Sequence, residues 1–186
     1  MYTALISLPF ADFVVNASWS GGGSESDPFQ LTRSAVTPAL PPGMSVDTAF
    51  ALRGTVFSAE PIHQFRFALQ FASIVPAGSP ESGECLDAQS FVLSDSRVMI
   101  GTEDGEAIAA RHGWFRLNQK SYPIGYLPNG FELSVDYIPA RSTLDFRFII
   151  VYNAIARDDC SDWFAVDVSH TNLLQLDAIV IRNGAK

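Results

Sequence analysis

Alternation of apolar and polar residues is the strongest pattern in the chain. In residues 65–71 every second residue is a large apolar one, and the positions between hold Arg66, Ala68 and Gln70. A period of two places these two sets on opposite faces of a β-strand. Residues 131–137 and 144–150 alternate in the same way. We therefore predict three strands, each with one buried and one exposed face.

Shorter apolar runs predict further strands, and no segment predicts a helix. The link 138–142 has the length of a hairpin loop, and Pro139 is expected to end the strand before it. Turn sequences such as Asp104-Gly105 separate many of the short runs. Many short strands with polar faces indicate an all-β fold, an antiparallel two-sheet β-sandwich. The additional strands are expected at 2–10, 48–57, 90–100, 106–110, 114–117, 163–168 and 174–181.

A length of 186 residues fits one domain with a sizeable core. Within it, residues 1–37 are expected to give an N-terminal edge strand followed by a flexible Gly/Ser-rich loop at 18–28. Residues 38–186 are expected to form the sandwich itself. A second loop rich in Pro, Gly and Ser is predicted at 76–84.

The charge and hydropathy of the chain exclude several classes of partner. The net charge of −8 is spread along the sequence, so nucleic acid would be repelled. No apolar run approaches the roughly 20 residues that cross a bilayer. The apolar start at 1–10 lacks a basic region before it, so we do not predict a cleaved signal peptide. The location of the protein stays open, between the cytoplasm and secretion by a non-standard route.

The candidate metal ligands and thiols do not follow a recognised spacing. Cys85 and Cys160 are interpreted as two unpaired thiols, with pairing in an oxidising compartment as the alternative. Asp158, Asp159 and Asp162 have a composition that calcium accepts, but the glycine and glutamate spacing of a calcium loop is missing. A solvated acidic turn explains them more simply. No metal or other cofactor is predicted.

The sequence gives little support to an enzymatic function. A glycosidase needs two carboxylates about 5 to 9.5 Å apart across a cleft. Glu132 and Asp136 share a strand face, but four residues of extended chain separate them by about 13 Å. No serine, histidine and aspartate stand in the context of a nucleophile motif. We therefore expect a binding protein rather than an enzyme.

From residue 38 onward, the order of the strands resembles the galectins, a lectin family whose β-sandwich binds galactosides. The likeness covers about residues 38–182 and implies a jelly-roll, concanavalin-like sandwich. It further implies two sheets of five or six antiparallel strands, with the sugar groove on one concave face. The segments that carry the resemblance are LPPGMSV at 40–46, FALRGTV at 50–56, FRFALQF at 65–71, YP at 122–123, NGFELSV at 129–135, residues 146–153 and residues 174–181.

Galectins bind galactose through a His, an Asn and an Arg on one strand. On this resemblance Leu93, Asp95 and Arg97 take those three places, so only the arginine matches. The usual galactoside hydrogen bonds should therefore be lost. An exposed Asp95–Arg97 pair without a ligand is the simpler alternative.

The family also stacks a tryptophan on the apolar face of the sugar and follows it closely with a glutamate. Trp114 is similar to that tryptophan, while Arg111 and His112 stand where an asparagine is expected. Arg116 and Leu117 follow, so the glutamate that orients the family's arginine is absent. Trp114 as a half-buried structural aromatic is the competing interpretation.

Two functions remain open from the sequence. One is a galectin-like module that recognises a glycan or glycoprotein through an altered groove. The other is a galectin-like structural or protein-interaction module, including a homo-oligomer, that has lost sugar binding. The candidate ligand-binding residues are Asp95, Arg97, Arg111, His112, Trp114 and Arg116.

Overall fold

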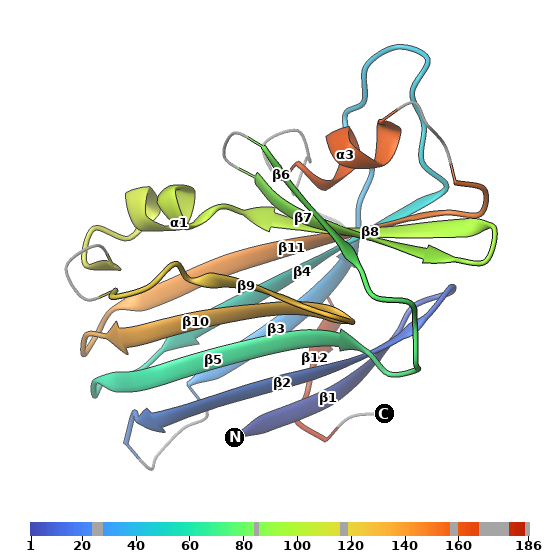
Figure 1. Cartoon of the computed structure of the whole chain (residues 1–186). Helices are drawn as coiled ribbons and strands as arrows, with labels where there is room; N and C mark the ends of the chain where they lie inside the picture. The colour runs from blue at the N-terminus through green and yellow to red at the C-terminus, as the bar shows by residue number, and fades with distance from the viewer. Residues whose placement is uncertain (24–27, 84–85, 116–118, 157–159, 168–178, 185–186) are drawn as a thin grey trace.

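Two antiparallel β-sheets packed face to face make up the protein (Figure 1). The computed structural model describes residues 1–23, 28–83, 86–115, 119–156, 160–167 and 179–184. The predicted all-β sandwich is confirmed. The resemblance implied five or six strands in each sheet, whereas the described residues form one sheet of five strands and one of seven.

The five-stranded sheet, sheet A, has the order β1-β2-β5-β10-β9. Every pairing in it is antiparallel. Its strands are β1 (Tyr2–Ser7), β2 (Asp12–Gly21), β5 (Ile62–Phe71), β9 (Ile124–Leu127) and β10 (Gly130–Ile138).

The seven-stranded sheet, sheet B, has the order β12-β3-β4-β11-β8-β7-β6. The short helices α1 (Gly105–Arg111) and α3 (Ser161–Val166) accompany it. Its strands are β3 (Phe29–Ala35), β4 (Thr48–Phe57), β6 (Ser79–Gly83), β7 (Leu86–Leu93), β8 (Ser96–Glu103), β11 (Thr143–Asn153) and β12 (Ile179–Ile181).

The main core lies between the sheets and is rich in phenylalanine. The alternating residues that the sequence assigned to buried faces are buried except for Tyr137, whose place is taken by Ile138, and Phe65, Phe67 and Leu133 are fully buried. Phe67 of sheet A meets Phe146 of sheet B edge to face, with ring centroids 4.9 Å apart. Aromatic pairs in this arrangement add to the stabilisation from burial alone. This packing fixes which residues of sheet B face outward.

A second, smaller apolar cluster lies on the outer face of sheet B, beneath α3. Gly101 on β8 makes the close approach of α3 possible, because a Cβ atom there would lie 2.5 Å from Cβ of Val166. One part of the outer face is therefore covered. The buried residues of this cluster are Val36, Ala49, Ala51, Leu86, Ala88, Met99, Ile149, Val151, Ala165 and Val166.

The interpretation of residues 138–142 as a hairpin link is wrong. Pro139 does end β10, but β10 pairs with β5 and β9 whereas β11 pairs with β4 and β8. The link therefore crosses from one sheet to the other. A link of this length can join two strands of one sheet or cross between sheets. Alternation identifies a strand but does not show which strands pair with it.

The single strand predicted at 90–100 is in fact two. A tight turn at Ser94 and Asp95 separates β7 from β8, and Ser94 adopts a left-handed conformation with φ of 57°. Asp95 thus lies in a turn and not on a strand face. The sequence did not reveal this turn, because apolar residues flank it on both sides and no glycine marks it.

Two predicted strands are helical. Residues 106–110 belong to α1, whose start is capped by Asp104, which accepts a hydrogen bond of 2.7 Å from the Ala107 N–H. Residues 163–166 belong to α3. Both helices are short, so the apolar positions in each do not cover enough turns to reveal a helical period. Residues 114–117 do not form the predicted strand where they are described, since Trp114 is in a turn and Phe115 is helical.

The N-terminal segment contributes more strands than expected. β1 is the predicted edge strand, but β2 and β3 also lie within residues 1–37, and β2 extends to Gly21 inside the predicted loop. Likewise, β6 occupies residues 79–83 of the second predicted loop. The C-terminal strand starts at Ile179 in the structure, and residues 174–178 lie outside the described part. Cys160 is exposed, whereas Cys85 lies outside the described residues.

Candidate functional site

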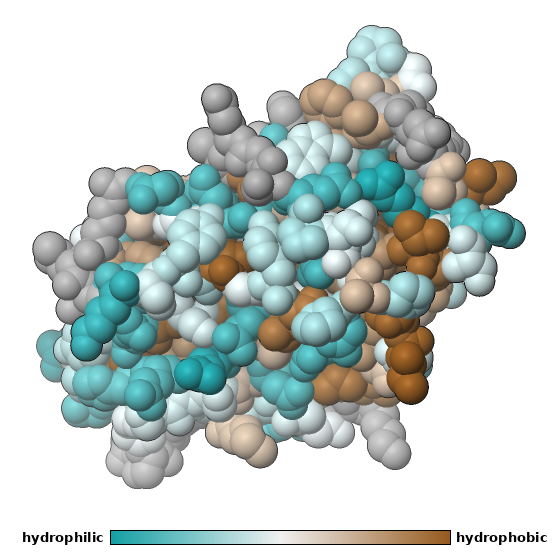
Figure 2. Space-filling view, in the orientation of Figure 1, coloured by the Kyte–Doolittle hydropathy of each residue, from teal (hydrophilic) through white to brown (hydrophobic). Residues whose placement is uncertain are grey.

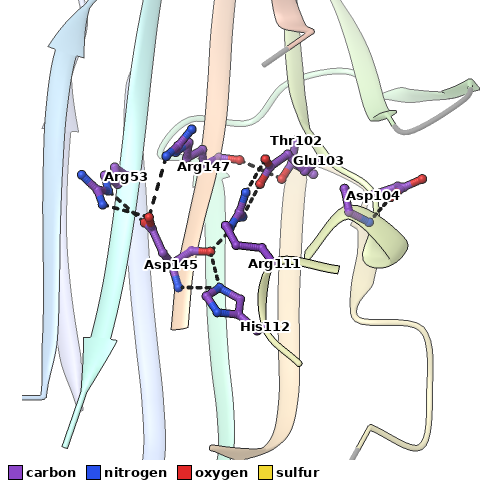
Figure 3. A network of polar contacts seen from close by, with 9 residues as sticks. Arg53, Thr102, Glu103, Asp104, Arg111, His112, Asp145 and Arg147 are labelled. Atoms are coloured by element: carbon purple, nitrogen blue, oxygen red, sulfur yellow. Dashed lines mark hydrogen bonds and ion pairs between the residues drawn. The ribbon is translucent and has the colours of Figure 1, made fainter. Parts of the chain in front are cut away.

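A cluster of charged side chains (Figure 3) lies on the outer face of sheet B, at the end near α1 and away from α3 (Figure 1). We call it the arginine face, and it consists of Arg53 on β4, Glu103 on β8, Arg111 on α1, and Asp145 and Arg147 on β11. The strand residues face outward because their neighbours along the chain, Leu52, Phe146 and Phe148 among them, are buried in the main core.

Asp145 holds Arg53 in a two-point contact across neighbouring strands. The Nε and Nη2 atoms of Arg53 donate hydrogen bonds of 2.9 and 2.8 Å to the two carboxylate oxygens of Asp145. The hydrogen bond to Asp145 raises the pKa of Arg53. The Asp145 side chain is 14% exposed, while that of Arg53 is 57% exposed. The guanidinium is therefore oriented but reachable from solvent.

Glu103 orients Arg111 in the same manner. Both terminal nitrogens of Arg111 donate to the carboxylate of Glu103. One of them also donates to the main-chain oxygen of Asp145 at 3.0 Å. Donation of these hydrogen bonds to Glu103 raises the pKa of Arg111. Helix α1 thus brings a second fixed guanidinium to the strands.

Arg147 is the third arginine, and its charge is the least closely paired with a carboxylate. Its nearest carboxylate oxygen is Oδ2 of Asp145, at 3.8 Å from Nη2. Its Nε atom makes no hydrogen bond within the part of the chain that the structure describes. The side chain is 27% exposed.

His112 connects the end of α1 to the start of β11. The main-chain N–H of Asp145 donates to His112 Nε2 at 3.1 Å, and the Asp145 carbonyl oxygen lies 3.2 Å from the same atom. Burial lowers the pKa of His112, and the positive charge of Arg111 lowers it further. A neutral ring is required for Nε2 to accept the N–H of Asp145.

Trp114 lies beside this region. It is half-buried and packs against the main core, and its ring centroid is 5.7 Å from that of His112. Phe115, next in the chain, is buried. Of the residues predicted from the sequence, the structure thus brings Arg111, His112 and Trp114 together.

Asp95 and Arg97 lie at the other end of β8. The Asp95 carbonyl accepts a hydrogen bond from the Ala156 N–H at 2.9 Å. Arg97 is the second residue of β8, and the six residues from there to Glu103 span roughly 20 Å. The predicted residues therefore do not converge on one groove. Arg116 lies outside the described residues.

Arg97 has structural partners. It pairs with Glu81 at 3.0 Å, and its Nε atom lies 2.9 Å from Oδ2 of Asp162 on α3, although the two are misaligned for a hydrogen bond. Asp162 is buried, and this burial raises its pKa, while the charge of Arg97 lowers it. Arg97 therefore ties α3 and β6 to β8.

A separate polar cluster links β9 and the residues before it to β7. Buried Asp87 accepts hydrogen bonds of 2.5 Å from Tyr122 and 2.6 Å from Tyr126. Burial and the bond to Asp87 raise the pKa of Tyr122 to about 12 and also raise that of Tyr126. The two tyrosine hydroxyls and the Asp87 carboxylate therefore satisfy one another's hydrogen-bonding capacity.

Neither a metal site nor a membrane span is found in the described part of the chain. Within it, no three His, Cys, Asp or Glu side chains group as metal ligands would. Its helices are all too short or too polar to cross a membrane.

Sequence reasoning missed Arg53, Glu103, Asp145 and Arg147. The signal was present, because Asp145 and Arg147 occupy the outward positions of an alternating strand. What was missing was the pairing of β4, β11 and β8, which places residues far apart in the sequence side by side.

The fold and the site define the class of the protein: an all-β, two-sheet antiparallel sandwich with a charged outer face on its larger sheet. No family model, curated protein or solved structure matches the chain.

Proposed function

We propose that the protein is a non-catalytic binding module that recognises a glycan at the arginine face, next to Trp114. The observation that carries the proposal is the pair of arginines, Arg53 and Arg111, each oriented by a bidentate carboxylate on the outer face of one sheet.

The arrangement suits sugar recognition for a physical reason. Hydroxyl groups are bound best by donors and acceptors that are already fixed, because ordering flexible side chains on binding costs free energy. A wrong epimer leaves such fixed groups unpaired, which gives selectivity. Aromatic rings provide a complementary surface for the apolar face of a sugar. Trp114, two residues beyond His112, is the candidate for that role.

The galectin resemblance adds support from a different direction. In that family a glutamate close to the tryptophan orients the binding arginine, and position 117 of this chain lacks it. In the structure Glu103 orients Arg111. A galectin-like module whose groove has shifted away from Asp95 and Arg97 and toward α1 accounts for both observations.

The second candidate is a galectin-like protein-interaction or structural module without sugar binding. Exposed apolar side chains favour it. Ile74 is fully exposed, and Val92 and Ile155 are more than half exposed. Figure 2 shows apolar residues gathered at the right-hand end of the molecule, where β5 ends and the β7–β8 hairpin turns. Exposed apolar patches of this kind mark interaction surfaces.

A glycan array followed by titration of the strongest ligand separates the two candidates. We expect wild-type protein to give a sugar-dependent signal that Trp114→Ala and Arg53→Ala each reduce about tenfold or more, since each removes a direct contact. Arg66→Ala is the matched control, because Arg66 is exposed on β5 of the other sheet. Silence of the wild-type protein on every glycan, with self-association in solution, would favour the second candidate.

A further inference from the structure

We infer that the ligand of the arginine face is an acidic glycan, in which a carboxylate or sulfate group binds Arg147. This inference rests on the proposed function, and it specifies the chemistry of the sugar.

The charge balance of the arginine face leaves one guanidinium without a close counter-ion. Three arginines face two carboxylates, and both carboxylates already hold an arginine in a bidentate pair. Arg147 is left with a contact of 3.8 Å to Asp145 and an Nε atom without a hydrogen bond in the described part of the protein. That Nε atom is buried, so an additional anion would complete the pairing at the terminal nitrogens of the side chain, which is 27% exposed.

The strand register places Arg147 beside another positive charge. Arg147 stands directly opposite Arg53 in the pairing of β11 with β4. Side chains in directly opposite positions have Cβ atoms about 4.5 to 5.5 Å apart, and like charges there are destabilising. Asp145 offsets part of that repulsion, but it binds Arg53 more closely than Arg147. An anion bound beside Arg147 would offset the remainder.

The chemistry of the group follows from the shape of arginine. A guanidinium presents a planar fork of N–H donors that matches two oxygens of a carboxylate or sulfate. The protein as a whole carries a net charge of −8, which repels extended polyanions. A single acidic group on an otherwise neutral sugar is therefore favoured over a nucleic acid or a densely sulfated polymer.

The test uses glycans that differ only in the acidic group. Suitable pairs are tri-galacturonate and its methyl ester, N-acetyllactosamine with and without a terminal sialic acid, and lactose with and without a 3-sulfate. We expect the full-length protein to bind the acidic member of at least one pair about tenfold or more tightly than the neutral member. The carboxylate and sulfate pairs together identify which acid is bound.

Variants then assign the preference to Arg147. Arg147→Gln should remove the discrimination between acidic and neutral members, and Arg147→Lys should retain part of it, because lysine keeps the charge but lacks the fork. Arg66→Gln should leave it unchanged. Thermal unfolding of each variant checks the fold. If Arg147→Gln does not fold, weakening of acidic binding by Arg147→Lys and by added salt tests the same contact.

The outcomes separate this inference from the proposed function. Equal binding of both members of every pair, or a preference for acid that survives Arg147→Gln, overturns the inference and leaves glycan binding intact. Failure of wild-type protein to bind any glycan overturns the proposed function, and the inference with it.

Discussion

The two ends of the outer face of sheet B are built from the same strands but differ in charge and in burial. On β11 the outward residues are Asp145 and Arg147 at one end and Ile149 and Val151 at the other. The charged end is open, whereas α3 covers the apolar end. One strand thus changes from a solvent-facing surface to a buried one between positions 147 and 149.

The difference shows how residue type decides what covers a sheet. Burying apolar area stabilises a fold by about 25 cal/mol per Å², so Ile149 and Val151 favour the docking of α3. Covering Arg147 would instead remove a charge from water without a close partner, which is costly.

The largest contrast is expected between neighbouring outward positions of β11. Ile149→Ala should destabilise the protein by about 3 kcal/mol, because Ile149 is fully buried beneath α3. Arg147→Ala should cost under about 1 kcal/mol, since the side chain is partly exposed and weakly paired. Denaturant unfolding of both variants measures the difference. Similar values would mean that the two ends are equally buried in solution.

The next largest difference in stability is expected between alanine substitutions at two glycines. Gly101→Ala should destabilise by about 2 kcal/mol, because the new Cβ atom would meet Val166 at 2.5 Å and displace α3. Gly113→Ala, near the open end, has nothing within 4 Å of the new atom and should change stability by less than about 0.5 kcal/mol. Thermal unfolding checks both. An unchanged stability of Gly101→Ala would show that α3 does not sit on β8.

The smallest effect is the pH dependence that His112 contributes at the open end. Burial lowers the pKa of His112 in the folded protein, so the unfolded chain takes up the proton first as the pH falls below about 6.5. The stability contributed by neutral His112 is therefore present above that pH and declines as the pH falls toward the folded-state pKa.

Urea unfolding of wild-type protein and of His112→Gln between pH 7.5 and pH 5 tests this assignment. The variant should lose part of the decline. His63→Gln serves as the matched control, because His63 is exposed on sheet A. A decline that persists in His112→Gln and disappears in His63→Gln would place the titrating group on the wrong sheet.

Alternation was enough to predict the fold class. β4 begins and ends where the sequence placed it, and the runs within β5, β10 and β11 put the predicted residues inward with the exception of Tyr137. It failed where elements are short. Fewer than two helical turns, as in α1 and α3, cannot be distinguished from a short strand by their apolar positions. The turn at Ser94 and Asp95 has no glycine to reveal it.

The candidate site was predictable only in part. Arg111, His112 and Trp114 are close in sequence and stay close in space. Arg97 and Arg111 are also close in sequence, yet β8 carries them to opposite ends. Arg53 joins Arg147 only because β4 pairs with β11. Cross-strand proximity depends on sheet topology, and periodicity along a single strand does not contain that information.

The contact between β1 and β12 has a consequence for how quickly the protein folds. The Tyr2 hydroxyl donates to the Ile181 carbonyl at 2.9 Å, and the Gly184 N–H donates to the Thr3 carbonyl at 2.7 Å. These bonds join sheet A to an edge strand of sheet B across nearly the whole sequence (Figure 1). Contacts between such distant residues carry a large loop-closure entropy and slow the folding of β-sandwiches to milliseconds or seconds. The seam between the two sheets is therefore expected to close after the hairpin β7–β8 has formed.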